Sequence, residues 1–255
     1  MGAIDQDGSL VFKQLFDVNC FTAVFQTLTC MLLLWSVIRG RGIKGRPYGP
    51  EGPPESGFIG VIVCMFSSFL YVCKSIDWGN KGTANLSFNK YWYSDYLVTC
   101  PLIVLDLCFT FEIHYKLVYF VSTFITLLFA VLSFTEDAPA RYWHFGIGSA
   151  FFAVFFYSIA KILMQRWRTV PEPGRIPMFV GLLIFFGMWP VFPVLWIFSW
   201  VGSGYITMHQ YYIIHCFLDI TCKTFFSFAC LLYRVRVEEW QWQAEVCIDP
   251  QRRSQ

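Results

Sequence analysis

The sequence predicts an all-α membrane protein built as a bundle of seven transmembrane helices. Of its 255 residues, 56% are hydrophobic and 20% are aromatic, whereas only 14% are charged. The mean hydropathy of the chain is +0.51. This composition is far from that of a soluble domain. The apolar residues are gathered in seven runs of about 20 residues, the length at which a helix crosses a bilayer.

The seven runs follow one another with short connections that leave no room for a soluble domain. In chain order they cover residues 18–38, 58–76, 91–111, 115–134, 142–164, 178–200 and 206–233. We therefore divide the chain into an N-terminal segment (1–17), one helical domain (18–235) and a C-terminal tail (236–255).

Glycine and proline mark one connection and several expected bends. Residues 40–55, between the first two runs, are rich in both, which favours an irregular connection. Pro101 lies within the third run, and Pro190 and Pro193 lie within the sixth. A proline inside a helix frees a backbone carbonyl and bends the helix. Such bends are common in membrane bundles that enclose a ligand.

Lysine and arginine are distributed unevenly between the two ends of the predicted bundle. The loops after the first and fifth runs and the tail hold Arg39, Arg41, Lys44, Arg46, Lys161, Arg166, Arg168, Arg175, Arg234 and Arg236. The alternate loops hold few, with Lys81 and Lys90 after the second run. The positive-inside rule therefore predicts an extracellular N-terminus and a cytoplasmic C-terminus in a multi-pass protein of the plasma membrane.

The chain has ten cysteines, and nine of them lie scattered through the apolar runs. Their spacing indicates neither a disulfide framework nor a metal site. We interpret them as small buried hydrophobic residues, and we expect no metal centre.

The seventh run carries two opposite charges near its middle. Asp219 and Lys223 are four residues apart and therefore lie on one face of a helix. Each charge at this depth costs roughly 2.5–3.5 kcal/mol, so an intramembrane lysine indicates a functional site. A buried ion pair that merely joins two helices is the alternative. The functional interpretation is an amine that forms a Schiff base with an aldehyde cofactor.

The third run carries a polar stripe. Asp95, Thr99 and Asp106 fall within about 40° of one another when successive residues turn by 100°. Asp95 lies toward the outer end, and Asp106 lies about 16 Å deeper toward the cytoplasm. Two carboxylates stacked at membrane depth indicate a pathway for charge or protons.

The sixth run carries an aromatic stripe. Trp189, Phe192, Pro193 and Trp196 share one helix face at positions i, i+3, i+4 and i+7. Such a stripe is by itself more often a packing surface than a cofactor site. Opposite a lysine with an adjacent carboxylate, it predicts a slot for a flat polyene.

Together, the lysine–aspartate pair, the polar stripe and the aromatic stripe resemble those of the microbial (type I) rhodopsins. This resemblance implies that Lys223 carries all-trans retinal as a protonated Schiff base, with Asp95 and Asp219 as counter-ions. The other positions that match the polyene-lining residues of that family are Tyr96, Cys100, Phe145, Gly148, Trp189, Phe192, Trp196 and Cys222.

Within that family the sequence is most similar to the kalium channelrhodopsins, which are light-gated potassium channels of heterotrophic protists. The similarity lies in the run from Asn89 to Tyr96, in Tyr71 and Lys74, and in the tyrosine pair of the seventh run. It implies a selectivity region and ion pathway formed by Asn89, Trp92, Asp95, Tyr71, Tyr211, Tyr212 and Asp219, with Thr99 and Asp106 farther in. It also implies that Cys100 affects the open lifetime, with Thr126 as the nearest polar partner.

The expected function is a light-gated cation channel with potassium preference, opened by photoisomerisation of the retinal on Lys223. One lysine-derived cation facing two carboxylates predicts a net negative outer half that admits cations. We expect no enzyme activity and no nucleic-acid partner. The expected partners are K⁺ and other monovalent cations, the lipid bilayer and, by the resemblance, two further copies in a homotrimer.

Two sequence features argue against an outward proton pump. Trp92 stands one helical turn before Asp95, where such pumps have an arginine. Residues 199–210 contain no carboxylate to release protons at the outer end. An outward proton pump and a sensory rhodopsin with a separate transducer are the two alternatives to a channel.

Overall fold

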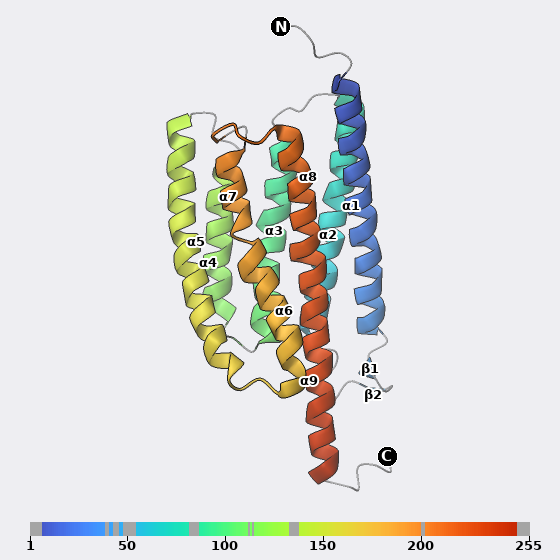
Figure 1. Cartoon of the computed structure of the whole chain (residues 1–255). Helices are drawn as coiled ribbons and strands as arrows, with labels where there is room; N and C mark the ends of the chain where they lie inside the picture. Colours follow the sequence, from blue (N-terminus) through green and yellow to red (C-terminus); the bar gives the residue numbers. More distant parts are fainter. Residues whose placement is uncertain are drawn as a thin grey trace.

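A computed structural model describes residues 7–38, 41–42, 46–47, 55–81, 87–111, 113, 115–132, 138–199 and 202–248. Over these residues the helical segments stand side by side as seven rods, and α1 begins at the end of the bundle opposite to that where α9 finishes (Figure 1). Six of the rods are long and apolar enough to cross a membrane, and the fourth holds a shorter apolar stretch, Phe120–Phe129. The predicted all-α membrane bundle is confirmed.

Five rods are single helices, and two are interrupted. The single ones are α1 (Asp7–Ile38), α2 (Glu55–Lys81), α3 (Ser87–Thr110), α4 (Tyr115–Leu132) and α5 (Ala138–Trp167). The sixth rod is α6 (Glu172–Met188) with α7 (Val191–Phe198), and the seventh is α8 (Met208–Asp219), η1 (Ile220–Phe225) and α9 (Phe226–Ile248). Most helices extend beyond the apolar runs, and α9 continues past the ends of its neighbours (Figure 1).

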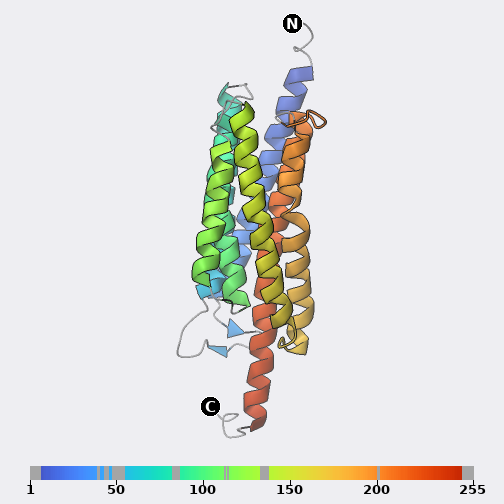
Figure 2. The same cartoon turned by 90° about the vertical axis from the view of Figure 1, so that its left-hand side faces the viewer.

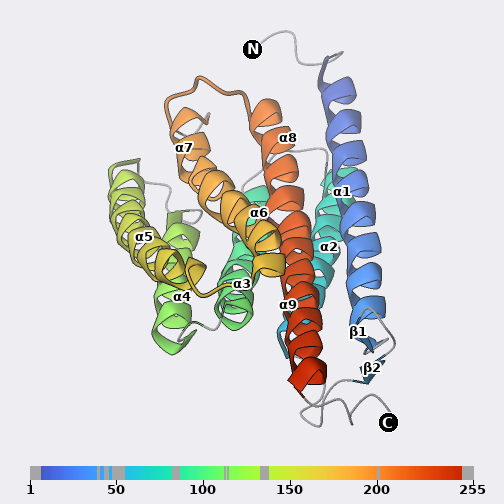
Figure 3. The ribbon, with the colours of Figure 1, turned by 60° about the horizontal axis from the view of Figure 1, so that its bottom comes forward.

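The connection between the first two rods contains a short strand pair. β1 (Arg41–Gly42) pairs antiparallel with β2 (Arg46–Pro47). The pair lies beyond the end of α1 (Figure 3). The rest of the loop that we predicted as irregular falls outside the described residues.

The prolines of the sixth run act differently from the proline of the third. α6 ends at Met188 and α7 begins at Val191, so the break falls at Pro190, which has no N–H to continue the ladder. The Phe192 N–H donates to the Trp189 carbonyl across this break. Pro101, in contrast, lies inside α3 without ending it.

The seventh rod changes its backbone pattern where it carries the lysine. It starts with a capping box, in which the Thr207 hydroxyl accepts from the Gln210 N–H and the Gln210 side chain accepts from the Thr207 N–H. Residues 220–225 then form a π-helix, a rare widened turn that is frequently found at functional sites. Lys223 lies in this turn.

The rods enclose a mixed interior and present apolar side chains outward. Figure 2 shows α3 and α4 on one side of the bundle and α1 with α6–α9 on the other. Large exposed hydrophobic residues, such as Phe21, Trp35 and Phe69, cover the outer faces of α1 and α2. Completely buried residues include Leu107, Phe185 and Phe226 as well as many polar groups. This inverted distribution suits a lipid environment.

Candidate functional site

Lys223 meets both predicted carboxylates inside the bundle. Its Nζ lies 2.6 Å from Asp95 Oδ2 and 3.3 Å from Asp219 Oδ1. Asp95 comes from α3, and Asp219 lies one turn before Lys223 in the seventh rod. All three side chains are buried, so α3 and the seventh rod are joined here by one cation and two carboxylates.

Helix α2 adds one hydroxyl to each carboxylate. Ser67 Oγ accepts from Lys223 Nζ at 3.0 Å and donates to Asp95 Oδ2 at 3.0 Å. The Tyr71 hydroxyl donates to Asp219 Oδ2 at 2.6 Å. The sequence prediction included Tyr71 but missed Ser67. The available signal was that the two are four residues apart, and so share a helix face.

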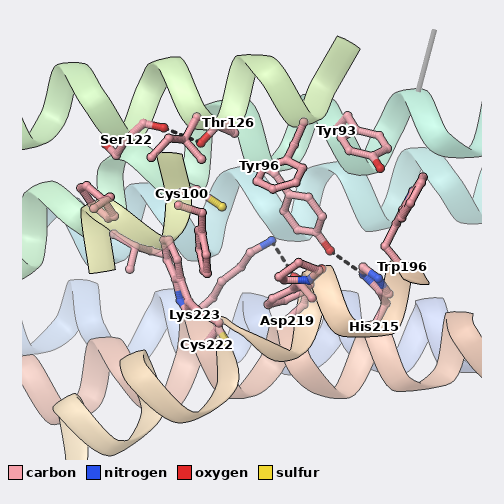
Figure 4. A pocket seen from close by; sticks show the side chains of 18 of the residues that line it. Tyr93, Tyr96, Cys100, Ser122, Thr126, Trp196, His215, Asp219, Cys222 and Lys223 are labelled. Atoms are coloured by element: carbon pink, nitrogen blue, oxygen red, sulfur yellow. Dashed lines mark hydrogen bonds and ion pairs between the residues drawn. The ribbon is translucent and has the colours of Figure 1, made fainter. Parts of the chain in front are cut away.

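A cavity bordered largely by aromatic side chains contains the amine of Lys223 (Figure 4). Seven of the eight predicted polyene contacts line it: Tyr96, Cys100, Phe145, Trp189, Phe192, Trp196 and Cys222. The Phe145 and Trp196 rings stack with centroids 4.3 Å apart. A flat apolar ligand with a group that reacts with an amine fits this combination of walls and nucleophile.

Gly148 is the exception among these predicted contacts, because it does not line the cavity. A Cβ at this position would come within 3.3 Å of the Phe129 ring. Phe129 of α4 lines the cavity in its place. The absence of a side chain at Gly148 therefore leaves space for the Phe129 ring. Gly148 would affect a ligand only indirectly, by allowing Phe129 this position.

Cys100 and Thr126 both line the cavity, from α3 and α4 respectively (Figure 4). The Thr126 hydroxyl donates to the Ser122 carbonyl within its own helix at 2.8 Å. The two predicted gating residues thus share the cavity, while the hydroxyl of Thr126 is engaged inside α4.

The predicted outer aromatic residues gather in the bundle interior. Tyr71, Tyr211 and Tyr212 belong to one buried cluster. Tyr212 is fully buried and donates to Asn19 Oδ1 of α1 at 3.0 Å, so its ring does not lie on the outer face of the bundle. Asn89 and Trp92 belong to α3, but their side chains lie outside the described part of the structure.

His215 links this cluster to the cavity, and the sequence prediction missed it. Its ring lies 4.2 Å from that of Tyr211, and its Nδ1 is 2.8 Å from the Tyr96 hydroxyl. His215, Asp219 and Lys223 follow one another at intervals of four residues, which would have placed the histidine on the functional face.

The inner part of the polar stripe is closed by an ion pair. The Thr99 hydroxyl donates to the Asp95 carbonyl at 2.8 Å. Asp106 Oδ1 lies 2.8 Å from Arg234 Nη1, which also donates to Thr110 Oγ1 at 2.8 Å. Arg234 had been counted among the basic residues of the tail. Its side chain is only 10% exposed, because it reaches back into the bundle to Asp106.

Lys74 changes the predicted charge balance. It is completely buried, and its Nζ lies 4.0 Å from the centre of the Tyr71 ring. The sequence argument counted one lysine against two carboxylates. If Lys74 is protonated, two cations accompany Asp95 and Asp219, and a net negative charge would then not account for the cation preference.

Comparison with known proteins places this architecture among characterised membrane proteins. The family model described as "Bacteriorhodopsin-like protein" matches residues 47–237. Bacterial rhodopsin CSR3 of Haloarcula vallismortis is 25% identical over 191 residues, covering 72% of this chain and 80% of the relative. Archaerhodopsin-3 of Halorubrum sodomense is 24% identical over 147 residues, covering 56% of each.

The fold is also similar to that of solved structures. The proton-pumping rhodopsin AR2 of the marine alga Acetabularia acetabulum aligns with a TM-score of 0.70 at 18% identity, covering 86% of this chain and 94% of that one. Xanthorhodopsin, a light-driven ion pump with dual chromophore, aligns with a TM-score of 0.74 at 13% identity, covering 92% and 96%. At these identities the likeness concerns the fold alone.

Proposed function

The chain belongs to the bacteriorhodopsin-like family of microbial rhodopsins, and from this premise we propose that it is a light-gated cation channel with a preference for K⁺. Proteins of this light-driven family are multi-pass membrane proteins that carry retinal as a Schiff base on a lysine, so retinal is the cofactor. The observation that carries the channel proposal is a set of buried polar groups beside Lys223. In this proposal the N-terminus is extracellular and the assembly is a homotrimer.

Lys223 is the attachment residue in this proposal. Its amine opens into the aromatic cavity, whereas Lys74, the other fully buried lysine among the described side chains, packs on Tyr71 and does not line it. Asp95 and Asp219 stabilise the cation that results. Retinal supplies light absorption and a change of shape when it is bound. The aromatic side chains of the cavity would exclude water from the polyene. The carboxylates of Asp95 and Asp219 would hold the positive charge at the nitrogen.

A polar seam runs through the bundle beside this site. We use that term for the buried polar residues Asn19, Thr22, Gln26 and Thr29 of α1, Ser67 and Ser68 of α2, and Thr224 and Ser227 of the seventh rod. Hydrogen bonds show that these helices face one another there: Ser68 donates to the Ala23 carbonyl, and Tyr212 donates to Asn19.

Gln26 indicates that the seam is hydrated. Its side chain is completely buried, yet neither its Nε2 nor its Oε1 has a hydrogen-bond partner among the described residues. Thr224 Oγ1 is likewise buried without one. A buried polar group without a partner costs about 1–3 kcal/mol, which water or a cation beside it would offset. A cation channel needs a hydrated row of polar groups, and these buried side chains support that proposal.

The outer aromatic cluster supports a preference for K⁺. Tyr71, Tyr211 and Tyr212 offer ring faces and hydroxyls, which replace water poorly around a tightly hydrated ion. The Lys74 amine lies over the Tyr71 ring, and this contact supports an aromatic face as a place for a monovalent cation in our proposal. Since Na⁺ holds its water more tightly than K⁺, this constriction would penalise Na⁺ more.

The inner ion pair provides a barrier that a light signal would have to open. Arg234 and Asp106 are held together inside the bundle, and Thr110 binds the same guanidinium. A fixed cation at the cytoplasmic end of the path repels a permeant cation. In our proposal the closed state therefore includes the Arg234–Asp106 pair, and conduction requires its displacement.

Replacing Gln26 by leucine tests the role of the polar seam. We expect the retinal chromophore to remain, because Gln26 does not line the cavity. The photocurrent should fall by about tenfold or more, since an apolar side chain removes the groups that solvate a cation. Gln26→Asn, which keeps the amide, should conduct. Val24→Leu on the outer face of α1 is the matched control, and full conduction by Gln26→Leu would remove the seam from the ion path.

The two carboxylates beside Lys223 should both affect the dark chromophore. Removing a negative charge near a cation destabilises the cation. Asp95→Asn should therefore change the dark absorption spectrum and let the chromophore lose its proton at lower pH, and Asp219→Asn should have a similar effect. Absorption spectra recorded across pH provide the measurement. Titrations of both variants that overlay the wild type would show that the counter-ion lies elsewhere.

Cys100 should influence how fast the channel closes. Its side chain lines the cavity, so Cys100→Ala removes a contact that favours return to the resting shape. Loss of about 1.4 kcal/mol would slow the decay of current after a light pulse by about tenfold. Thr126→Val, which changes another residue that lines the cavity, provides the comparison. An unchanged decay in Cys100→Ala would make this cysteine a packing residue.

A further inference from the structure

A third side chain lies at the nitrogen of Lys223, in addition to the two carboxylates. Ser67 Oγ, Lys223 Nζ and Asp95 Oδ2 form a closed triangle with sides of 3.0, 3.0 and 2.6 Å. A hydroxyl can accept and donate at once. Ser67 does both here, since it accepts from the lysine and donates to the carboxylate. Its side chain is completely buried, and both bonds are made to groups of the protein.

The same helix serves the second carboxylate through a different hydroxyl. Tyr71, one turn along α2 from Ser67, donates to Asp219 Oδ2 at 2.6 Å. Each carboxylate therefore receives one hydroxyl donor from α2. Asp95 Oδ1 has no hydrogen-bond partner among the described residues. In this part of the chain, Ser67 and Lys223 thus act on the same single oxygen of Asp95.

We propose that Ser67 is a positioning residue that keeps Asp95 ionised and aligned beside the Lys223 nitrogen. A hydrogen bond donated to a carboxylate favours its charged form. A Schiff-base nitrogen carries one N–H, whereas a free ammonium carries three. When Lys223 carries retinal it loses donors, and the hydroxyl of Ser67 remains to hold the carboxylate. Ser67 thereby sets the colour of the chromophore and the pH range over which that colour is stable.

This inference rests on attachment of retinal at Lys223, but not on conduction of ions. A protein that gave no photocurrent would still show the effect in its dark spectrum. Conversely, if the protein conducted ions but Ser67→Ala left its spectrum unchanged, the proposed function would stand and only this inference would fail.

The test is a dark spectral titration of purified, retinal-loaded variants. Ser67→Ala should undergo its acid-induced colour change at a pH about one unit higher than the wild type, because Asp95 has lost its hydroxyl donor. Ser67→Thr keeps a hydroxyl and should stay near the wild type. Ser68→Ala is the matched control, since the neighbouring hydroxyl donates to the Ala23 carbonyl and to no group at Lys223.

A double variant shows whether Ser67 acts through Asp95. In an Asp95→Asn background there is no carboxylate at position 95 to ionise, so the Ser67→Ala effect should vanish. If Ser67→Ala yields no pigment, Ser67→Cys replaces it, and its weaker donor should produce a smaller shift in the same direction. The proposal would be overturned if the Ser67→Ala titration overlaid that of Ser68→Ala, or if Ser67→Ala caused an equal shift in the Asp95→Asn background. Where Ser67→Ala yields no pigment, an unshifted Ser67→Cys titration would overturn it.

Discussion

Lys223→Ala is expected to give a folded membrane protein that develops no visible absorption band when retinal is added. The reason is chemical, because a Schiff base requires a primary amine and alanine has none. Among the residues that the structure describes, Lys223 is the lysine whose side chain lines the aromatic cavity. The variant also removes the cation between Asp95 and Asp219, so expression and helix content should be measured with the spectrum.

The described part of the chain offers a matched control for this experiment in a second fully buried lysine. Lys74 packs over the Tyr71 ring and does not line the cavity, so Lys74→Met should retain a visible band. Loss of the band in Lys223→Ala together with its retention in Lys74→Met would assign the attachment residue. A visible band in folded Lys223→Ala would refute that assignment.

Truncating the outer aromatic residues is expected to weaken discrimination between K⁺ and Na⁺. Tyr212→Ala removes a completely buried ring together with its bond to Asn19. The constriction should then accept a more hydrated ion, and relative Na⁺ permeability should rise by about tenfold, which corresponds to ~1.4 kcal/mol. With K⁺ inside and Na⁺ outside, the reversal potential of the photocurrent should move to more positive values. Trp92→Ala should act in the same direction.

Two further variants distinguish the effect of the Tyr212 ring on the reversal potential from that of its hydroxyl and from that of a general disturbance of the helix. Tyr212→Phe keeps the ring and loses the bond to Asn19, so an intermediate shift would indicate that α1 positions the ring. Ile213→Ala, at the next position but more exposed, is the control that should leave the reversal potential unchanged. Unchanged reversal potentials in both Tyr212→Ala and Trp92→Ala would place selectivity elsewhere in the chain.

The rods and the charged centre could be predicted because they depend on order along the chain. Hydropathy over about 20 residues detects a membrane span, and a spacing of four places two side chains on one helix face. The lysine–aspartate pair, the polar stripe and the aromatic stripe followed from these two rules, whereas the counter-ion roles and the other cavity contacts were implied by the resemblance to microbial rhodopsins. Gly148 does not line the cavity itself, because its effect depends on Phe129 of the neighbouring helix.

The contacts between rods could not be predicted, since they depend on how each helix is rotated against its neighbours. Ser67 and Ser68 are adjacent serines, yet one hydroxyl contacts Lys223 and the other contacts α1. The spacing of four residues between Ser67 and Tyr71 was the only sequence signal that favoured Ser67. Arg234 looked like a basic flank of the last helix but reaches back to Asp106. Gln26 could not be predicted as a site residue either, because it is uncharged and its complete burial depends on how α1 packs against its neighbours.

The most direct test of the channel proposal is the photocurrent–voltage relation of cells expressing the protein, with K⁺ inside and Na⁺ outside. We predict a sustained light-gated current that is outward at zero voltage and reverses at a negative potential, toward the equilibrium potential of K⁺. With the same ions on both sides, the current at zero voltage should vanish. An outward current that persists in symmetric solutions and does not reverse would instead identify an outward pump, and the absence of any current would contradict conduction altogether.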